Sequence, residues 1–129
     1  MAENQVDNPA GNPVGAGGPE PDLTDVQLTV VDNEAAQRFE IYSAGKLAAF
    51  TRYRREEPAT FAFTHTETIP AYAGHGVGST LVAEVMVRMR AGGYSVLPYC
   101  PFVNAYLRKH PEDADLVPAD QRRRFGVGS

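Results

Sequence analysis

A glycine-rich segment, residues 68–80, is the part of this sequence best suited to binding an anion. It reads TIPAYAGHGVGST and places glycine at Gly74, Gly76 and Gly78. Glycine lets the main chain turn tightly and approach a ligand closely, and a helix that begins here would direct its free N–H groups and positive dipole end outward. The segment therefore predicts a phosphate-binding loop, and a flexible loop without a ligand is the alternative.

Two known phosphate-binding motifs do not fit this loop. No Lys-Ser or Lys-Thr pair closes it, as a Walker A motif requires, and the preceding segments read as antiparallel hairpins rather than a βαβ unit. The pattern favours a pyrophosphate held by main-chain amides over a triphosphate with magnesium.

The second candidate for chemistry is Cys100, the single cysteine of the chain, in the segment PYCPF. Pro101 is expected to begin a helix, and a cysteine at a helix N-terminus favours the nucleophilic thiolate. A small buried apolar residue is the alternative. One cysteine excludes an intrachain disulfide and a cysteine-rich zinc site, and it fits a reducing cytosol.

Three histidines complete the candidate groups. His65 lies within a predicted strand and would meet Cys100 if the fourth and fifth strands are neighbours, which predicts a Cys and His couple; a structural histidine is the alternative. His75 would contact a phosphate from the glycine loop, or stand exposed. His110 is expected to cap a helix end. Such scattered residues predict no metal site.

The elements that must position these residues follow from hydrophobic periodicity. Alternation predicts four strands in an antiparallel meander, and a period near 3.6 then predicts a helix from Val77 to the Gly92-Gly93 pair. Alternation along the fourth strand places Phe61, Phe63, His65, Glu67 and Ile69 on one face. The fold class is therefore α+β (α/β in the broad sense), with a mixed, mainly antiparallel sheet of five to six strands and two or three helices. The expected strands are 27–31, 38–43, 46–54, 60–69 and 94–99, with 115–117 as a possible sixth, and the second helix is 101–110.

Composition divides the chain into three parts. Residues 1–26 hold four Pro, four Gly, five acids and no Lys or Arg, which predicts a disordered acidic tail, either regulatory or only solvating. Residues 27–118 are the expected folded domain, and residues 119–129, with Arg122 to Arg124, are an expected flexible basic tail. Of the 16 acids 5 lie in the first part, so 12 basic residues face 11 acids after it. This near-neutral balance predicts no nucleic-acid binding.

Localisation is also predicted from composition. No apolar run approaches the roughly 18 residues of a membrane helix, and no signal segment is evident. We expect a cytoplasmic protein that makes no membrane contact and is a monomer or a homodimer, the latter through apolar surface around Phe50.

In this order, the motifs resemble those of the GNAT N-acetyltransferase superfamily. The chain is most similar to a small single-domain branch, and the resemblance spans about residues 27–118. The matching motifs are His65-Thr66, Gly74 to Ser79, Cys100-Pro101-Phe102-Val103, Tyr106 and Lys109-His110-Pro111.

The resemblance implies that acetyl-CoA binds in a cleft between the fourth and fifth strands. The pantetheine arm would lie along Thr68 and Ile69, and the pyrophosphate on Gly74, His75, Gly76, Val77, Gly78 and Ser79. The superfamily loop begins with Gln or Arg, where this chain has Ala73.

The implied activity is acetyl transfer from acetyl-CoA to an amine of a small molecule or peptide. Either a base activates the amine for direct attack, or Cys100 carries the acetyl group with His65 as its partner. Tyr106 would donate a proton to the leaving thiolate, or serve as a core residue. A non-catalytic acyl-CoA-binding or protein-interaction module is the competing function.

Overall fold

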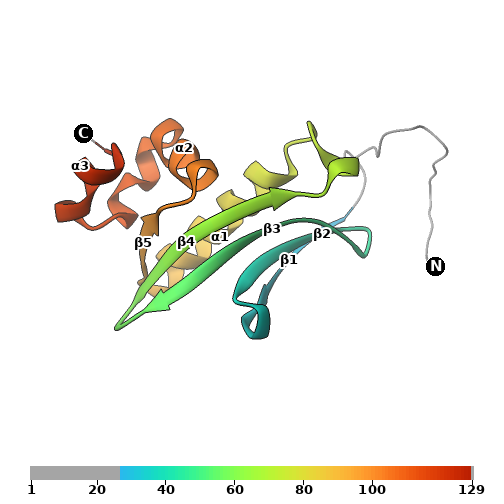
Figure 1. Ribbon diagram of the computed structural model, residues 1–129, viewed down its shortest axis with the longest axis horizontal. Helices are drawn as coiled ribbons and strands as arrows, with labels where there is room; N and C mark the ends of the chain where they lie inside the picture. The colour runs from blue at the N-terminus through green and yellow to red at the C-terminus, as the bar shows by residue number, and fades with distance from the viewer. Residues whose placement is uncertain (1–26, 129) are drawn as a thin grey trace.

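Segments with two-residue periodicity build one sheet. The computed structural model describes residues 27–128, and its strands lie in the order β1-β2-β3-β4-β5. The first four strands pair antiparallel, and β5 runs parallel to β4 (Figure 1). The predicted fold class is confirmed. The strands are β1 (Leu28–Asn33), β2 (Arg38–Ser43), β3 (Lys46–Glu56), β4 (Thr60–Thr68) and β5 (Ser95–Pro98).

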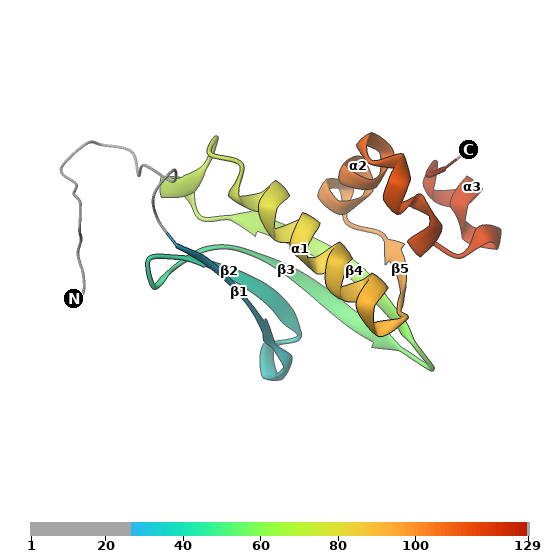
Figure 2. The same cartoon turned by 180° about the vertical axis from the view of Figure 1, so that it is seen from behind.

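One helix, α1, covers a face of this sheet, and the later helices lie at its β5 end. Helix α1 lies across it, behind the strands in Figure 1 and in front of them in Figure 2, and α2 follows β5 at one end. Gly93, in the left-handed region at φ 73°, ends α1 as the glycine pair predicts. The α-helices are α1 (Val77–Gly92), α2 (Pro101–Lys109) and α3 (Arg122–Phe125), and the 3-10 segments are η1 (Glu34–Ala36), η2 (Pro70–Tyr72), η3 (Pro111–Leu116) and η4 (Ala119–Gln121).

The core lies between α1, α2 and the sheet. Helix α1 buries one stripe at helical spacing, α2 adds two side chains, and the strands supply mainly aromatic rings. Burial of this apolar surface provides most of the driving force for folding. The main contributors are Leu81, Val82, Val85, Met86 and Met89 of α1, Val103 and Leu107 of α2, and Phe39, Ile41, Tyr53, Phe61 and Phe63 of the sheet.

A β-bulge divides β4 into two parts. Tyr53 is opposite Phe63 and Arg52 is opposite His65, so Thr64 has no residue opposite it on β3. The extra residue reverses the alternation: Phe63 is buried in the core, whereas His65 lies on the sheet face away from α1. The prediction of one continuous face from Phe61 to Ile69 is therefore wrong beyond Phe63.

The sheet face opposite α1 carries a buried carboxylate. Glu40 is 3% exposed and accepts hydrogen bonds from Arg38 Nε (2.6 Å), Tyr42 Oη (2.8 Å) and Asn33 Nδ2 (3.1 Å). Burial alone would raise the pKa of Glu40, but these three donors and the charge of Arg38 outweigh it and leave the pKa lowered. Glu40 is thus ionised and holds β1 and β2 together.

The chain after α2 differs from expectation. Residues 115–117 do not form a sixth strand, because η3 turns there and brings Asp113 and Asp115 to the Arg90 guanidinium at 3.2 and 2.9 Å. Residues 119–128 are not a flexible tail either: Val127 is fully buried, and Asn104 Nδ2 donates to the Phe125 carbonyl at 2.8 Å. The predicted acidic tail, residues 1–26, lies outside the described residues.

Candidate functional site

Strands β4 and β5 separate after four residue pairs. Their last pair is Phe63 with Pro98, and the Cys100 N–H still donates to the Phe63 carbonyl at 2.8 Å. Beyond this point β4 continues to Thr68, while the chain after β5 turns into α2. Among the strands of residues 27–128, the second half of β4 therefore has β3 on one side and none on the other.

The main chain of this half of β4 is available on the side that β5 leaves. The Ile69 N–H donates to the Ala48 carbonyl of β3 at 2.8 Å. Because main-chain groups alternate between the two sides of a strand, the groups of Thr66 and Thr68 point away from β3. They can pair with an extended ligand.

The N-terminus of α1 lies beyond the end of β4. Gly76 precedes the helix with φ 78°, and its carbonyl accepts the first helical hydrogen bond, from the Thr80 N–H at 3.0 Å. The amides of Val77, Gly78 and Ser79 therefore have no acceptor within the helix. The first turn also contains no acidic residue, so no side-chain carboxylate of this turn competes for these three donors.

One amide of the predicted loop is used internally. The His75 N–H donates to the Tyr72 carbonyl at 3.3 Å. The set of available donors is thus narrower than the expected run from Gly74 to Ser79, and it centres on the first turn of α1.

Three elements converge at Gly78. A Cβ atom at this position would lie 2.9 Å from Phe102 Cζ of α2 and 3.3 Å from Thr68 Oγ1 of β4. Only a residue without a side chain fits here without displacing a neighbour. Gly78 therefore sets how closely α1, β4 and α2 approach one another beside the three free amides.

Cys100 lies at the point where the two strands separate. It precedes Pro101, the first residue of α2, and is 2% exposed. Its Sγ lies 3.1 Å from Thr66 Oγ1, and Thr66 Oγ1 lies 2.8 Å from Thr51 Oγ1. The thiol is thus linked to two hydroxyl groups on the helix-facing side of the sheet.

His65 is not brought to Cys100. Its side chain is 56% exposed, with Nε2 at 3.2 Å from Glu67 Oε1 and its ring 6.3 Å from that of Phe50, on the opposite face of the sheet. The predicted Cys and His couple is wrong in this geometry, because the bulge at Thr64 turns Thr66 toward the thiol instead. Thr66 was missed as a site residue, and no pattern in the sequence marks the bulge.

Tyr106 lies on α2, one turn after Phe102 and on the same helix face. It is partly buried against the core, and its ring stacks on that of His110 at 4.0 Å. Burial, together with the charges of Asp113 and Glu112, raises the pKa of Tyr106. The phenol keeps its proton at neutral pH. His110 caps α2 as expected, since its N–H donates to the Leu107 carbonyl.

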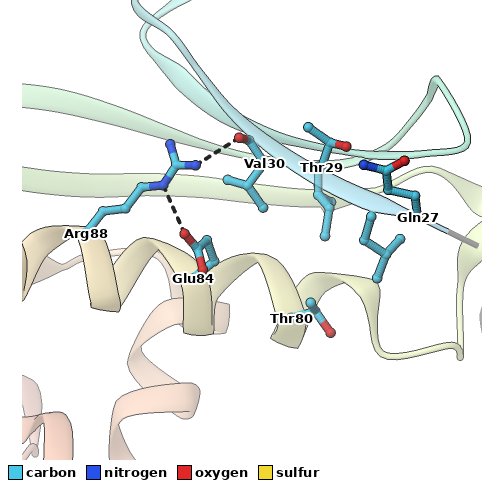
Figure 3. A pocket seen from close by; sticks show the side chains of 8 residues that line it. Gln27, Thr29, Val30, Thr80, Glu84 and Arg88 are labelled. Carbon is cyan, nitrogen blue, oxygen red and sulfur yellow. Dashed lines mark hydrogen bonds and ion pairs between the residues drawn. The ribbon is translucent and has the colours of Figure 1, made fainter.

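A groove of about 430 Å³ lies elsewhere, between β1 and α1 (Figure 3). Arg88 reaches across it, with Nη2 donating to the Val30 carbonyl at 2.9 Å and Nε to Glu84 Oε2 at 3.2 Å. No feature of the sequence predicts this groove. Its lining residues are Gln27, Leu28, Thr29, Val30, Ile41, Thr80, Glu84 and Arg88.

Residues 27–128 offer neither a cluster of metal ligands nor a membrane-spanning helix. No group of three or more His, Cys, Asp or Glu side chains there is placed to hold a metal ion. Of the helices described, none is both long enough and apolar enough to cross a bilayer.

A mainly antiparallel sheet whose fourth and fifth strands separate beside a glycine-opened helix defines the N-acetyltransferase class of fold. A family model described as GCN5-related N-acetyl-transferase matches residues 38–116, more than half of the chain, and the protein belongs to this family. The resemblance to the GNAT superfamily is confirmed over residues 38–116. No curated protein matches the chain.

Proposed function

We propose that this protein is an acetyl-CoA-dependent N-acetyltransferase that acts on an amine of a small molecule or a peptide. One observation carries the proposal beyond family membership: three unpaired amides at the start of α1 lie next to the half of β4 that has no strand on one side. The amides at the start of α1 suit a diphosphate, and the open side of β4 suits an extended chain of amide groups. Acetyl-CoA contains both, in this order.

The chain's own residues fit this cosubstrate. The amides of Val77, Gly78 and Ser79 would hold the pyrophosphate, with Gly74 and Gly76 allowing the main chain to approach. Both glycines have φ near +80°, and a Cβ atom at either would meet nothing within 4 Å. Ala73 offers no polar side chain, so the binding energy comes from main-chain donors and the helix dipole.

Along β4, the pantetheine amides would pair with the main chain of Thr66 and Thr68. Ile69 contributes less than the sequence predicts, because its N–H already bonds to β3. This path leads from the start of α1 toward the point where the strands separate. Cys100 lies there.

We further propose that Cys100 carries the acetyl group. Its thiolate attacks the thioester carbonyl, so that the Sγ–C bond forms, the bond between carbon and the CoA sulfur breaks, and the thiol proton passes to the departing CoA thiolate. The acceptor amine then attacks the acetyl-cysteine, the N–C bond forms, Sγ leaves, and the proton released by the amine restores the thiol. Tyr106, protonated at neutral pH, is the proposed relay for this proton: its phenol donates to the CoA thiolate and recovers the proton that the Cys100 thiol gave up.

Calorimetry with acetyl-CoA tests the binding site. The wild type is expected to bind, and Gly76→Asp to lose binding because a carboxylate is placed against the pyrophosphate. Gly76→Ala is the matched control, since it carries the same strain at φ 78° without a charge. Equal binding by Gly76→Asp and Gly76→Ala would contradict the placement, and a wild type that binds neither acetyl-CoA nor CoA would refute the function.

Intact-mass measurement tests the role of the thiol. Wild type incubated with acetyl-CoA is expected to gain one acetyl group that disappears when an amine acceptor is added, and Cys100→Ser is expected to gain none that an amine removes. Acetyl transfer by Cys100→Ala at the wild-type rate would instead establish direct attack by the amine.

A further inference from the structure

Thr51, Thr66 and Cys100 form a continuous hydrogen-bonded chain inside the protein. Thr51 is fully buried and Cys100 is 2% exposed, and the two successive distances are 2.8 Å and 3.1 Å. In the proposed acetyl transfer only the sulfur forms and breaks bonds, and the two hydroxyl groups take no part in those steps.

Either atom can be the donor in each of these hydrogen bonds, so their direction depends on the charge of the sulfur. A hydroxyl group has one proton to donate, and a buried one normally donates it. The partner of the Thr51 hydroxyl is Thr66 Oγ1. If Thr51 donates to Thr66, the Thr66 proton is directed to Cys100 Sγ, and the sulfur is the acceptor at the end of the chain.

A thiolate accepts this hydrogen bond better than a thiol does, because hydrogen bonds to a charged acceptor are stronger. When Cys100 is protonated, its S–H can donate to Thr66, which then donates to Thr51. The change between the two arrangements rotates two hydroxyl groups and moves no heavy atom. The hydrogen bonds among Thr51, Thr66 and Cys100 can therefore reverse direction when the charge of the sulfur changes.

We propose that Thr66 is a positioning residue for Cys100, which orients the sulfur and stabilises it as a thiolate, with Thr51 fixing the direction of the Thr66 hydroxyl. The proposal rests on the proposed role of Cys100 as acetyl carrier. In the first step Thr66 supports the attacking thiolate, and in the second it donates to the sulfur as that sulfur leaves the acetyl group. No bond to Thr66 forms or breaks.

Charged and titratable groups on the surrounding elements are engaged elsewhere. The segment that forms β5, SVLP, contains none. On β4, His65 and Glu67 pair with each other on the opposite sheet face. Tyr99, next to Cys100, has its ring against Phe125 and the guanidinium groups of Arg54 and Arg124. Arg108 and Lys109 are exposed in the last turn of α2. The remaining groups are Arg52 over the Phe50 ring on the opposite face, Tyr53 bonded to Asp32, Glu84 and Arg88 beside β1, and Tyr106 stacked on His110.

A label on the single cysteine makes the test direct. With [13Cβ]cysteine the protein gives one resonance, whose shift follows ionisation of the thiol without a reagent that must reach a buried atom. We expect Thr66→Val to move the pH midpoint of this titration upward by about one unit. Thr66→Ser, which keeps the hydroxyl, should stay within a few tenths of the wild type.

Acetyl-adduct formation gives the second readout. At saturating acetyl-CoA, Thr66→Val should acylate about ten-fold more slowly at neutral pH, since less thiolate is present. Rates are compared at saturation, so a change in Kd for acetyl-CoA does not enter the comparison. A midpoint that is the same in Thr66→Val as in the wild type, or that shifts equally in Thr66→Val and Thr66→Ser, overturns the proposal.

Two features keep the test decisive. If Thr66→Val does not fold, Thr51→Val replaces it, with an expected upward shift of a few tenths of a unit, and no shift overturns the proposal. The titration needs no acetyl-CoA, so failure of the proposed function appears as absent CoA binding, whereas failure of the Thr66 proposal appears as an unmoved midpoint.

Discussion

A single negative charge added at the start of α1 should stabilise the helix and at the same time weaken ligand binding. Ser79 is exposed and occupies the third helical position. In Ser79→Glu the new carboxylate interacts favourably with the helix dipole, so we expect the free energy of unfolding to rise by about 0.5 kcal/mol. The same carboxylate would face the pyrophosphate, so binding of acetyl-CoA should weaken.

The expected loss can be worked out from the geometry. A carboxylate at this position lies roughly 6 Å from a diphosphate held by the first-turn amides, and Coulomb's law in water gives about 0.7 kcal/mol for each of two phosphate charges. The sum, about 1.4 kcal/mol, raises Kd about ten-fold. This value applies at low salt: passage of part of the field through protein increases it, and added salt decreases it.

Val87→Glu is the matched control for this prediction. Val87 is 61% exposed on the same helix and lies eight residues further along, about 12 Å from Ser79, which exceeds the Debye length of about 8 Å at physiological salt. Calorimetry with acetyl-CoA and urea unfolding are run on both variants at low and high salt. Equal affinity of Ser79→Glu and Val87→Glu at low salt would refute the placement of the pyrophosphate.

Three further predictions concern the framework around the site. Glu40→Gln should lower the free energy of unfolding by about 2 kcal/mol in urea titrations, because the carboxylate loses its charge-assisted donors; a loss no larger than that of Tyr42→Phe would contradict this. Since the pKa of Glu40 is lowered by folding, the contribution of its carboxylate to stability is complete above about pH 5 and is lost as the pH falls through the pKa of the folded state. The wild type should therefore lose more stability in acid than Glu40→Gln. Parallel profiles of stability against pH in the two proteins would contradict this. Leu107→Ala, at a fully buried position, should lower the free energy of unfolding by about 3 kcal/mol. Gly93→Ala should lower it by about 1 kcal/mol, through the left-handed conformation of this residue alone. Equal losses in the two variants, measured by urea unfolding, would argue against this packing.

Most of the fold could be predicted because local periodicity and turn chemistry agree with it. The turn at Ala44-Gly45, with both φ values positive, joins two strands whose starts were predicted to the residue. The helix beginning at Val77 and ending before Gly93 was equally clear. The segment after Pro111 could not be predicted, because its conformation depends on Arg90, an α1 side chain distant in the sequence.

The site could be predicted only in part. The loop at the start of α1 and the cysteine before α2 were identified, since each follows from glycine and proline positions near an element boundary. The partner of Cys100 was not, because the alternation from Phe61 to Thr68 is unbroken in the sequence and the bulge exists only through pairing with β3. Which of two adjacent residues, His65 or Thr66, faces the thiol is therefore a property of the sheet.

The contact between Arg88 and the Val30 carbonyl has a consequence for self-association. β1 is the outer strand of the sheet, and an outer strand with available main-chain groups is a template for pairing with another chain. Here a helix side chain occupies one of the carbonyl groups that an incoming strand would need, so edge-to-edge addition requires the loss of a charge-assisted hydrogen bond. A substitution that shortens Arg88 would therefore free the Val30 carbonyl for an incoming strand without altering β1 itself.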